Sequence, residues 1–199
     1  GWLRDTLGMA SGLRLVEADA CRIDYDALMG DAPYRCIANL PYACGTVCLA
    51  RMLSSAHRPE EMFLLFQREV AERLSAPPGN RQYGALSVKV QSAYTVKIVR
   101  HVPPDVFYPI PDVGSAYLHL LRRSDALAAS DQACLRRVVE RAFGQRRKRL
   151  FRLLAARYGA ECTANALAGA GIPENARAEA VTVEQFRVLA RWLKPFDDA

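Results

Sequence analysis

The chain has 199 residues, of which 51% are hydrophobic and 24% are charged, which excludes a disordered protein and suits one ordinary domain with a small second one. The formal net charge of +6 favours a polyanionic partner, with RNA, DNA and an anionic membrane surface as the candidates. No apolar run approaches the roughly 20 residues of a membrane span, and residues 1–5 lack the start of a signal peptide. We therefore expect a cytoplasmic protein that spans no membrane.

The first part of the chain alternates short apolar runs with helical patterns. Residues 13–16, 34–38 and 61–66 are typical of strands, whereas residues 45–55 and 69–74 are typical of helices. Strands that alternate with helices are joined by right-handed crossovers and form a parallel sheet. The sequence therefore predicts an α/β fold for this part.

Two further runs, residues 94–99 and 115–120, are rich in β-branched and aromatic side chains and predict strands. The prolines between them predict a rigid surface loop, the kind of place where functional residues concentrate; they are Pro103, Pro104, Pro109 and Pro111. Residues 122–125 have the composition of a linker. We therefore expect one domain over residues 1–121 and a second over residues 122–199.

The last third of the chain predicts helices only. Apolar residues from Leu135 to Phe143 follow the spacing of an amphipathic helix, and Ser130 or Asp131 can cap its start. The remaining predicted elements are a helix over 146–158 that ends at Gly159, a turn over 171–173 and a helix over 183–193.

The cysteines show no C-x-x-C pair, and the histidines stand alone in the sequence. Cys44 and Cys48 are four residues apart and can share a helix face. Since paired ligand spacings are absent, we expect no metal site, and instead reduced, mostly buried thiols. The six cysteines are Cys21, Cys36, Cys44, Cys48, Cys134 and Cys162.

The sharpest motif is Asn39-Leu40-Pro41-Tyr42, which directly follows the predicted strand 34–38. In open α/β sheets, ligands bind at the carboxyl ends of strands. The exocyclic amine of adenine is a poor nucleophile because its lone pair is conjugated into the ring. The side-chain oxygen of Asn39 and the carbonyl of Leu40 can accept hydrogen bonds from such an amine and free its lone pair for attack on a methyl group.

The other two residues of the motif fit the same chemistry. Pro41 biases Leu40 to an extended conformation, which helps to aim the Leu40 carbonyl. Tyr42 offers a flat face for an extruded base. The alternative is a plain strand-ending turn, because Asn and Pro are favoured in turns.

Four further segments carry the pattern of one family. Residues 66–74 resemble its strand-to-helix segment, 83–88 its Tyr-Gly-x-Leu-Ser-Val run, 107–116 its Phe-x-Pro-x-Pro-x-Val-x-Ser loop and 143–148 its Phe-x-Gln-Arg-Arg-Lys signature. Over nearly all 199 residues, the chain is thus similar to the small-subunit ribosomal RNA adenine dimethyltransferases of the KsgA type. This resemblance implies the Rossmann-like sheet of S-adenosylmethionine-dependent methyltransferases, followed by a small all-helical domain.

The resemblance also implies roles for residues at matching positions. The target adenine is held and stacked by Asn39, Leu40, Pro41, Tyr42 and Phe107. The cofactor S-adenosylmethionine is contacted by Asp19, Ala20 and Asn39, with the Asp19 carboxylate accepting from the adenine amine of the cofactor. By the residues alone, Asp19 is also a candidate helix N-cap and Phe107 a candidate buried loop anchor.

The chain departs from the pattern of the family. Gly114 stands where the family usually has Asp, and Asp112 stands where it usually has Lys. The glycine-rich cofactor loop and the acidic residue for the cofactor ribose precede the segments found here, and neither is in the chain. We therefore expect an excerpt of a longer protein, in which the N-terminal part of the sheet is missing.

Residues 134–158 carry nine basic side chains against a single acid, Glu140, and Arg outnumbers Lys eight to one. Such a stripe can neutralise several phosphates through forked contacts, although a solvated helix face is the simpler alternative. The predicted RNA-binding residues are Arg136, Arg137, Arg141, Arg146, Arg147, Lys148 and Arg149.

The resemblance implies dimethylation of two adjacent adenines near the 3′ end of small-subunit ribosomal RNA, within the pre-ribosomal small subunit. Nothing in the sequence suggests more than a monomer. A methyltransferase acting on large-subunit ribosomal RNA shares the amine-holding motif, but the 143–148 signature favours the small-subunit type. Two other classes stay open: a non-catalytic ribosome-assembly or mitochondrial transcription factor on the same fold, and a DNA adenine methyltransferase. The intact 39–42 motif disfavours the first, and the helical domain disfavours the second.

Overall fold

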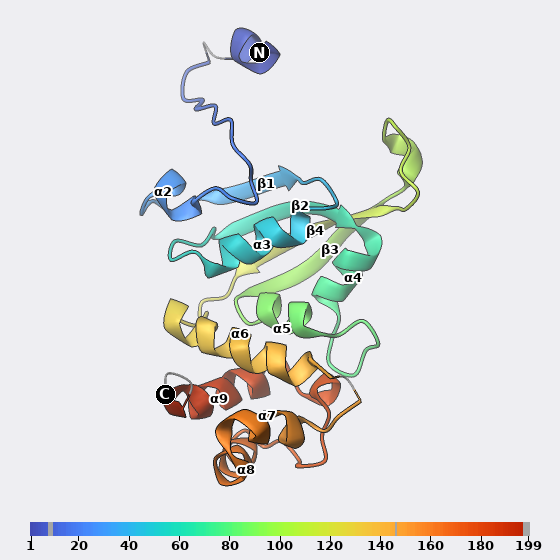
Figure 1. The fold of residues 1–199 in the computed structure, drawn as a ribbon. Coiled ribbons are helices and arrows are strands. Elements are labelled where there is room, and N and C mark those ends of the chain that lie inside the picture. The colour runs from blue at the N-terminus through green and yellow to red at the C-terminus, as the bar shows by residue number, and fades with distance from the viewer. Residues whose placement is uncertain (8–9, 146, 197–199) are drawn as a thin grey trace.

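The computed structural model of the chain describes residues 1–7, 10–145 and 147–196. A sheet lies in the upper half of the molecule and a group of helices lies below it (Figure 1). The strands are β1 (Arg35–Asn39), β2 (Glu61–Gln67), β3 (Tyr94–Val102) and β4 (Ser115–Arg122). They confirm the four strands predicted from residue 34 onward.

Helices cover one face of the sheet and make up the part of the chain that follows it. Before β4 the chain forms α1 (Trp2–Leu7), α2 (Tyr25–Met29), α3 (Gly45–Ser54), α4 (Arg68–Ser75), α5 (Ala85–Gln91) and the 3-10 turn η1 (Pro104–Val106). After β4 it forms α6 (Ala129–Phe143), α7 (Leu150–Tyr158), α8 (Ala160–Gly169), η2 (Ala178–Ala180), α9 (Val183–Leu193) and η3 (Lys194–Phe196). Of these described helices, none is long and apolar enough to pass through a bilayer.

The sheet is mixed, with the strand order β1-β2-β4-β3. β1 and β2 are parallel, as predicted, but β4 runs antiparallel to both β2 and β3. The sheet as a whole is therefore mixed, whereas parallel strands are predicted only for the first part of the chain. The reason lies in the connection between β3 and β4, which lacks a covering α-helix and so turns the chain back beside β3 instead of carrying it across the sheet.

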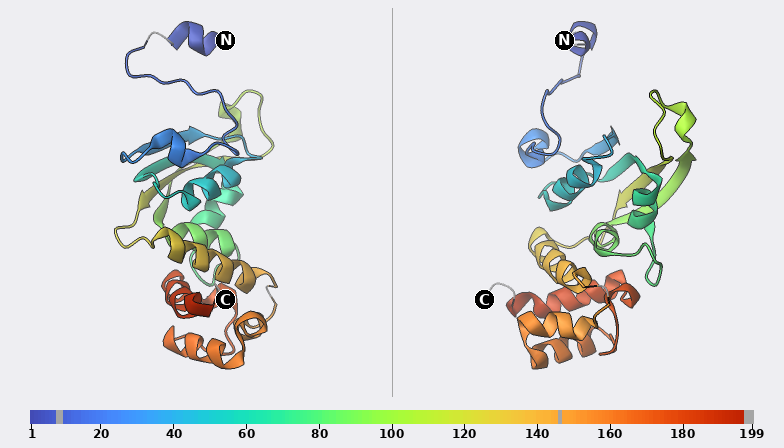
Figure 2. Two further views of the ribbon diagram at one scale, coloured as in Figure 1. Left: turned by 60° about the vertical axis from the view of Figure 1, so that its left-hand side comes forward. Right: turned by 45° about the vertical axis from the view of Figure 1, so that its right-hand side comes forward.

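The prediction of a strand over residues 13–16 is wrong, because this segment has no regular secondary structure and pairs with none of the four strands. Leu13 and Val16 are both about half exposed. An apolar run of β-formers favours an extended backbone, but a strand also needs a partner for its hydrogen bonds. α1, which precedes this segment, projects away from the rest of the molecule and has no buried residue (Figures 1 and 2).

One face of the sheet carries the core, because alternate residues of the strands point toward α3 and α4. Met62 and Leu64 of β2 and Leu118 of β4 are fully buried there, together with Leu49 of α3 and Leu74 of α4. On the opposite face, the rings of Phe63 and His119 stack at 4.7 Å.

The C-terminal helices enclose a second core, which confirms that the last third of the chain is helical. α6 packs against both α5 and α9. Tyr83, just before α5, is fully buried in this core, where its hydroxyl donates to the carbonyl of Val181 at 2.9 Å and its ring meets Phe143 edge-on. The second core thus includes residues from both sides of the proposed domain boundary at residues 121 and 122.

The helix termini differ from the sequence prediction in two places. α6 starts after Ala128, and Ser130 and Asp131 lie in its first turn, where both contact Lys194 instead of capping the helix. α7 starts at Leu150, so residues 147–149 are not helical, and Arg146 lies outside the described residues. The predicted end at Gly159 is confirmed by its φ of 81°, which favours glycine.

The segment predicted as a linker is held by ion pairs. Arg123 and Asp125 bond each other at 2.8 Å, and Arg123 also reaches Glu184 of α9 at 2.7 Å. Arg187, only 3% exposed, approaches the Asp125 carboxylate at 2.9 Å. These arginines hold the pKa of Asp125 well below its usual range, Arg123 contributing most.

The first turn of α3 lies so close to β2 that only glycine fits at position 45. A Cβ atom on Gly45 would lie 2.8 Å from Cε1 of the buried Phe66 ring. We expect Gly45→Ala to lower the free energy of unfolding by about 1–3 kcal/mol, because overpacking displaces either the ring or the helix. Urea denaturation measures this change.

Gly84→Ala serves as the matched control, since the nearest atom to its new Cβ would be the carbonyl oxygen of Gln82 at 4.0 Å. An equal loss of stability in the two variants would contradict the steric explanation.

Candidate active site and RNA-binding surface

The sheet brings the ends of three strands and the start of the fourth to one edge. Asn39 at the end of β1 pairs with Leu65 of β2, while Ser115 at the start of β4 pairs with both Gln67 and Val102. The loops over residues 40–44 and 103–114 therefore leave the sheet at the same edge. Both carry residues that the sequence singles out for binding a base.

The turn after β1 exposes Asn39 and leads into α3. The carbonyl of Pro41 accepts from the backbone N–H groups of Cys44 at 3.0 Å and Gly45 at 3.1 Å. Pro41 thus shapes the start of the helix, and its carbonyl is occupied. The two acceptors that the resemblance implies, the Asn39 side chain and the Leu40 carbonyl, belong to the residues just before it.

Tyr42, in the turn after β1, is hydrogen-bonded to the first residue of β4. Its hydroxyl bonds the Oγ atom of Ser115 at 2.7 Å, and Ser115 is only 1% exposed. The tyrosine as a whole is 37% exposed. The hydrogen bond fixes one end of the ring, so that a partly exposed aromatic face is held in place at the edge of the sheet.

The loop over residues 103–114 extends from the sheet edge at the upper right (Figure 2, right-hand view). Phe107 is partly buried, and its N–H donates to the carbonyl of Pro104 at 3.1 Å. Its neighbours are open to solvent, with Tyr108 99% and Ile110 67% exposed. At its other end, the loop is fixed to α4 by a bond from the Arg68 N–H to the Gly114 carbonyl at 2.9 Å. The predicted surface loop is confirmed.

Asp19 caps a turn rather than a helix. Its Oδ1 atom accepts from the Cys21 N–H at 2.8 Å, while Oδ2 lies 3.4 Å from the Arg22 guanidinium. The carbonyl of Ala20 accepts from the Tyr25 hydroxyl at 3.0 Å. Because the Asp19 side chain is 55% exposed, it retains acceptor sites for an amino group.

This turn lies against the start of α3. The sulfur of Cys21 is 3.9 Å from the carbonyl oxygen of Cys44, the residue just before α3. Tyr42 is only two residues further back along the chain. The fold therefore brings residues 19–21 close to the 39–42 turn, although the sequence separates them by about twenty positions.

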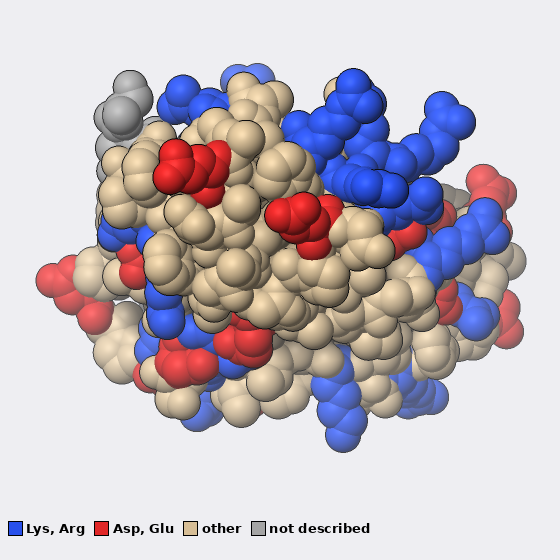
Figure 3. Space-filling view, turned by 90° about the horizontal axis from the view of Figure 1, so that it is seen from below, with Lys and Arg blue, Asp and Glu red and all other residues tan. Residues whose placement is uncertain are grey.

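The basic residues divide between two surfaces. Arg136 lines a hollow of about 320 Å³ between α3, α5 and α6, away from the sheet edge. Arg147, Lys148, Arg149 and Arg152 instead line a hollow of about 580 Å³, where Glu174 is the only acid among the described lining residues. Figure 3 shows Lys and Arg side chains gathered at one corner of the end formed by the C-terminal helices.

Two further predicted RNA-binding residues line neither hollow. Arg137 and Arg141 are exposed on α6, and Arg146 is outside the described residues. Glu140, the acid within the basic run, is paired with Lys89 of α5 at 2.7 Å. This pairing leaves the excess of positive charge on the surface around α6 and α7 intact.

The family of the chain follows from its similarity to known proteins. Residues 2–194 match the model of the family described as Ribosomal RNA adenine dimethylase. The chain belongs to this family.

Individual members of the family align over most of the chain. The Ribosomal RNA small subunit methyltransferase A of Syntrophotalea carbinolica is 42% identical over 183 residues, which cover 89% of this chain and 68% of the relative. The protein of the same name from Aeromonas hydrophila is 38% identical over 194 residues, which cover 96% of this chain and 70% of that one.

Solved structures support the fold. The 23S rRNA methyltransferase ErmE superposes with a TM-score of 0.69 at 22% identity, covering 96% of this chain and 76% of that chain. A dimethyladenosine transferase from Plasmodium falciparum superposes with a TM-score of 0.65 at 22% identity, covering 78% of this chain and 66% of that chain. The predicted Rossmann-like methyltransferase sheet with an added helical part is therefore confirmed.

Sequence reasoning missed the role of Ser115 as the anchor of Tyr42. The residue lies near the end of the 107–116 segment that resembles the family loop, so a signal was present. What the sequence lacked was the register that places Ser115 next to the 39–42 turn.

The Tyr42–Ser115 hydrogen bond predicts a coupling between the two residues. We expect Tyr42→Phe and Ser115→Ala each to lower the free energy of unfolding by about 1 kcal/mol, because each removes one partner of a partly buried bond. The double variant should lose less stability than the two single variants lose together, because both substitutions remove the same hydrogen bond. Urea denaturation of the four proteins gives the coupling energy, and strictly additive losses would contradict the bond.

Proposed function

We propose that the protein transfers methyl groups from S-adenosylmethionine to the exocyclic amines of adenines in small-subunit ribosomal RNA. The observation that carries the proposal is the exposed Asn39 at the end of β1, on the same sheet edge as the loop with Phe107. Membership of the ribosomal RNA adenine dimethylase family supports the substrate class.

In this proposal, the 39–42 turn prepares the amine for reaction. The side-chain oxygen of Asn39 and the carbonyl of Leu40 accept its two N–H bonds, so that the lone pair leaves conjugation and points at the methyl carbon. The ring of Tyr42, anchored by Ser115, and the ring of Phe107 stack on the two faces of the flipped base. After transfer, the nitrogen loses a proton to water, and the step needs no metal.

S-adenosylmethionine supplies the methyl group when bound. The residues proposed to hold it are Asp19, Ala20 and Asn39. Asp19 accepts from the adenine amino group through the part of its carboxylate that the 19–21 turn leaves exposed. Asn39, at the end of β1, is proposed to contact both the cofactor and the base.

The exposed cations of α6 and of the segment before α7 are proposed to bind RNA phosphates. The hollow lined by Arg147, Lys148, Arg149 and Arg152 is the best candidate, because four cations face one acid among its described lining residues.

We propose that the target within the RNA is two adjacent adenines near its 3′ end, within the pre-ribosomal small subunit. We further propose a cytoplasmic monomer with domains over 1–121 and 122–199.

Methyl transfer tests the proposal directly. Under-methylated small ribosomal subunits are incubated with labelled S-adenosylmethionine and the protein. Nucleoside mass spectrometry should detect dimethyladenosine. We expect Asn39→Ala to lower kcat by on the order of 100-fold, because one preorganised acceptor is lost at the reacting amine.

Asn165→Ala is the matched control, since Asn165 is exposed on α8, far from the sheet edge, and should leave the rate unchanged. Tight binding to the subunits without any methylated adenosine would overturn the enzyme assignment. It would favour the non-catalytic assembly factor instead.

The RNA surface predicts a change in salt dependence. The double variant Arg147→Gln/Lys148→Gln should bind ribosomal RNA with a weaker salt dependence. The negative slope of log K against log salt should become shallower by about 0.7 to 0.9 for each phosphate that the protein no longer neutralises. The control Lys97→Gln/Arg100→Gln removes the same charges from exposed positions of β3. Equal slopes in the two variants would contradict the assignment of the hollow to RNA.

A further inference from the structure

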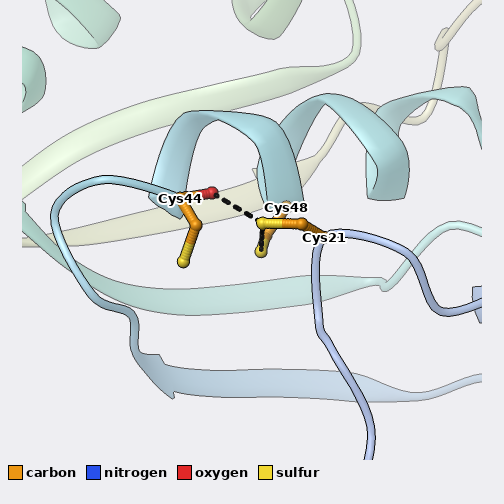
Figure 4. A group of neighbouring side chains, drawn as sticks. All are labelled: Cys21, Cys44 and Cys48. Carbon is orange, nitrogen blue, oxygen red and sulfur yellow. Dashed lines mark hydrogen bonds between the residues drawn. The ribbon is translucent and has the colours of Figure 1, made fainter.

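Three cysteines from two distant parts of the chain meet beside the first turn of α3. Cys44 directly precedes the helix and Cys48 lies one turn into it, while Cys21 comes from the turn after Asp19 (Figure 4). Their sulfur atoms all lie within 4.8 Å of one another, and the Cys21 and Cys48 sulfurs are 3.7 Å apart. All three are free thiols.

These distances suit a shared metal ion. Four thiolates at about 2.3 Å from a tetrahedral zinc ion lie about 3.8 Å from one another, which is close to the 3.7 Å between Cys21 and Cys48. The Cys44 sulfur lies within 4.8 Å of the other two and 3.5 Å from the Pro41 carbonyl oxygen, so it would have to turn toward them to share an ion. Thiolate sulfur selects soft ions over magnesium or calcium.

The loop that carries Cys21 is held in place by α3 and α2. The guanidinium of Arg51, on α3, donates to the carbonyls of Arg22 at 3.1 Å and Ile23 at 2.9 Å. On the other side, the Tyr25 hydroxyl of α2 donates to the carbonyl of Ala20. Cys21 is therefore positioned against the helix before any ion arrives, which lowers the ordering cost of binding.

We propose that Cys21, Cys44 and Cys48 form a binding site for a soft, thiophilic metal ion of the zinc class. Cys48 is fully buried and supplies the inner ligand, whereas Cys21 and Cys44 are partly exposed and leave a path for the ion. Three protein ligands leave the fourth position of a tetrahedral ion to water. The site adjoins the proposed cofactor turn, but the ion has no role in the proposed methyl transfer.

Binding must release protons, because the ion takes thiolates and the free thiols are protonated. Burial, together with the neighbouring Cys21, raises the pKa of Cys48 to about 12, and burial also raises the pKa of Cys44. The titratable groups facing the site are Tyr25 of α2, Cys36 of β1 and Asp19. Affinity should therefore increase with pH as thiol protons are lost to solvent.

Cobalt(II) serves as the test ion, because its thiolate complexes absorb in the near ultraviolet and the visible range. The reduced protein is titrated with cobalt under argon, and zinc is then added. We expect one equivalent to give the thiolate-to-cobalt band and zinc to remove it. Cys21→Ser and Cys44→Ser should each weaken binding by on the order of 100-fold, since each removes a ligand.

Cys162→Ser is the matched control, because Cys162 is a partly buried free thiol on α8, outside the group. It should bind cobalt like the unaltered protein, and circular dichroism verifies that all variants are folded. No thiolate band in the unaltered protein, or an equal loss of affinity in Cys162→Ser, would overturn the site. Neither result bears on the proposed methyl transfer, because the titration uses no RNA and no S-adenosylmethionine.

Discussion

The antiparallel insertion of β4 between β2 and β3 decides where the candidate site residues lie. Because β4 runs against its neighbours, its first residue, Ser115, meets the ends of β2 and β3. The loop that joins β3 to β4, with Phe107, therefore opens at the edge where β1 ends in Asn39. With a parallel β4, the chain would have to cross to the opposite edge first. The proposed pairing of the 39–42 turn with Phe107 depends on this one reversal.

α3 is the second common support. Its first turn packs on Phe66 through Gly45, its start is formed by the carbonyl of Pro41, and Arg51 further along holds the loop after Asp19. The proposed base site, cofactor turn and thiol group are thus attached to one short helix. A displacement of α3 would disturb all three together, which is why the close approach at Gly45 matters beyond local stability.

The segments that identify the family contain two kinds of residue. Tyr83 and Phe143 are core residues that join the helical part to the region around α5, and the Oγ atom of Ser87 caps the start of α5 by accepting from the Gly84 N–H. Asn39, Tyr108 and Arg147 are instead exposed. The segments that resemble the family therefore include residues needed for packing as well as candidates for binding and catalysis. The burial of each side chain separates the two groups.

The sequence by itself determined the strands from residue 34 onward, the helical last third and the 39–42 turn, because periodicity and turn chemistry are local properties. It also indicated the family, since several motifs occur in order. Only the tertiary structure decided the mixed sheet, the missing ladder at residues 13–16 and the bond between Tyr42 and Ser115, because strand pairing joins distant segments. The grouping of Cys21 with Cys44 and Cys48 is likewise tertiary, because it exists only after the loop has folded onto α3. The spacing of cysteines along the sequence therefore could not indicate it.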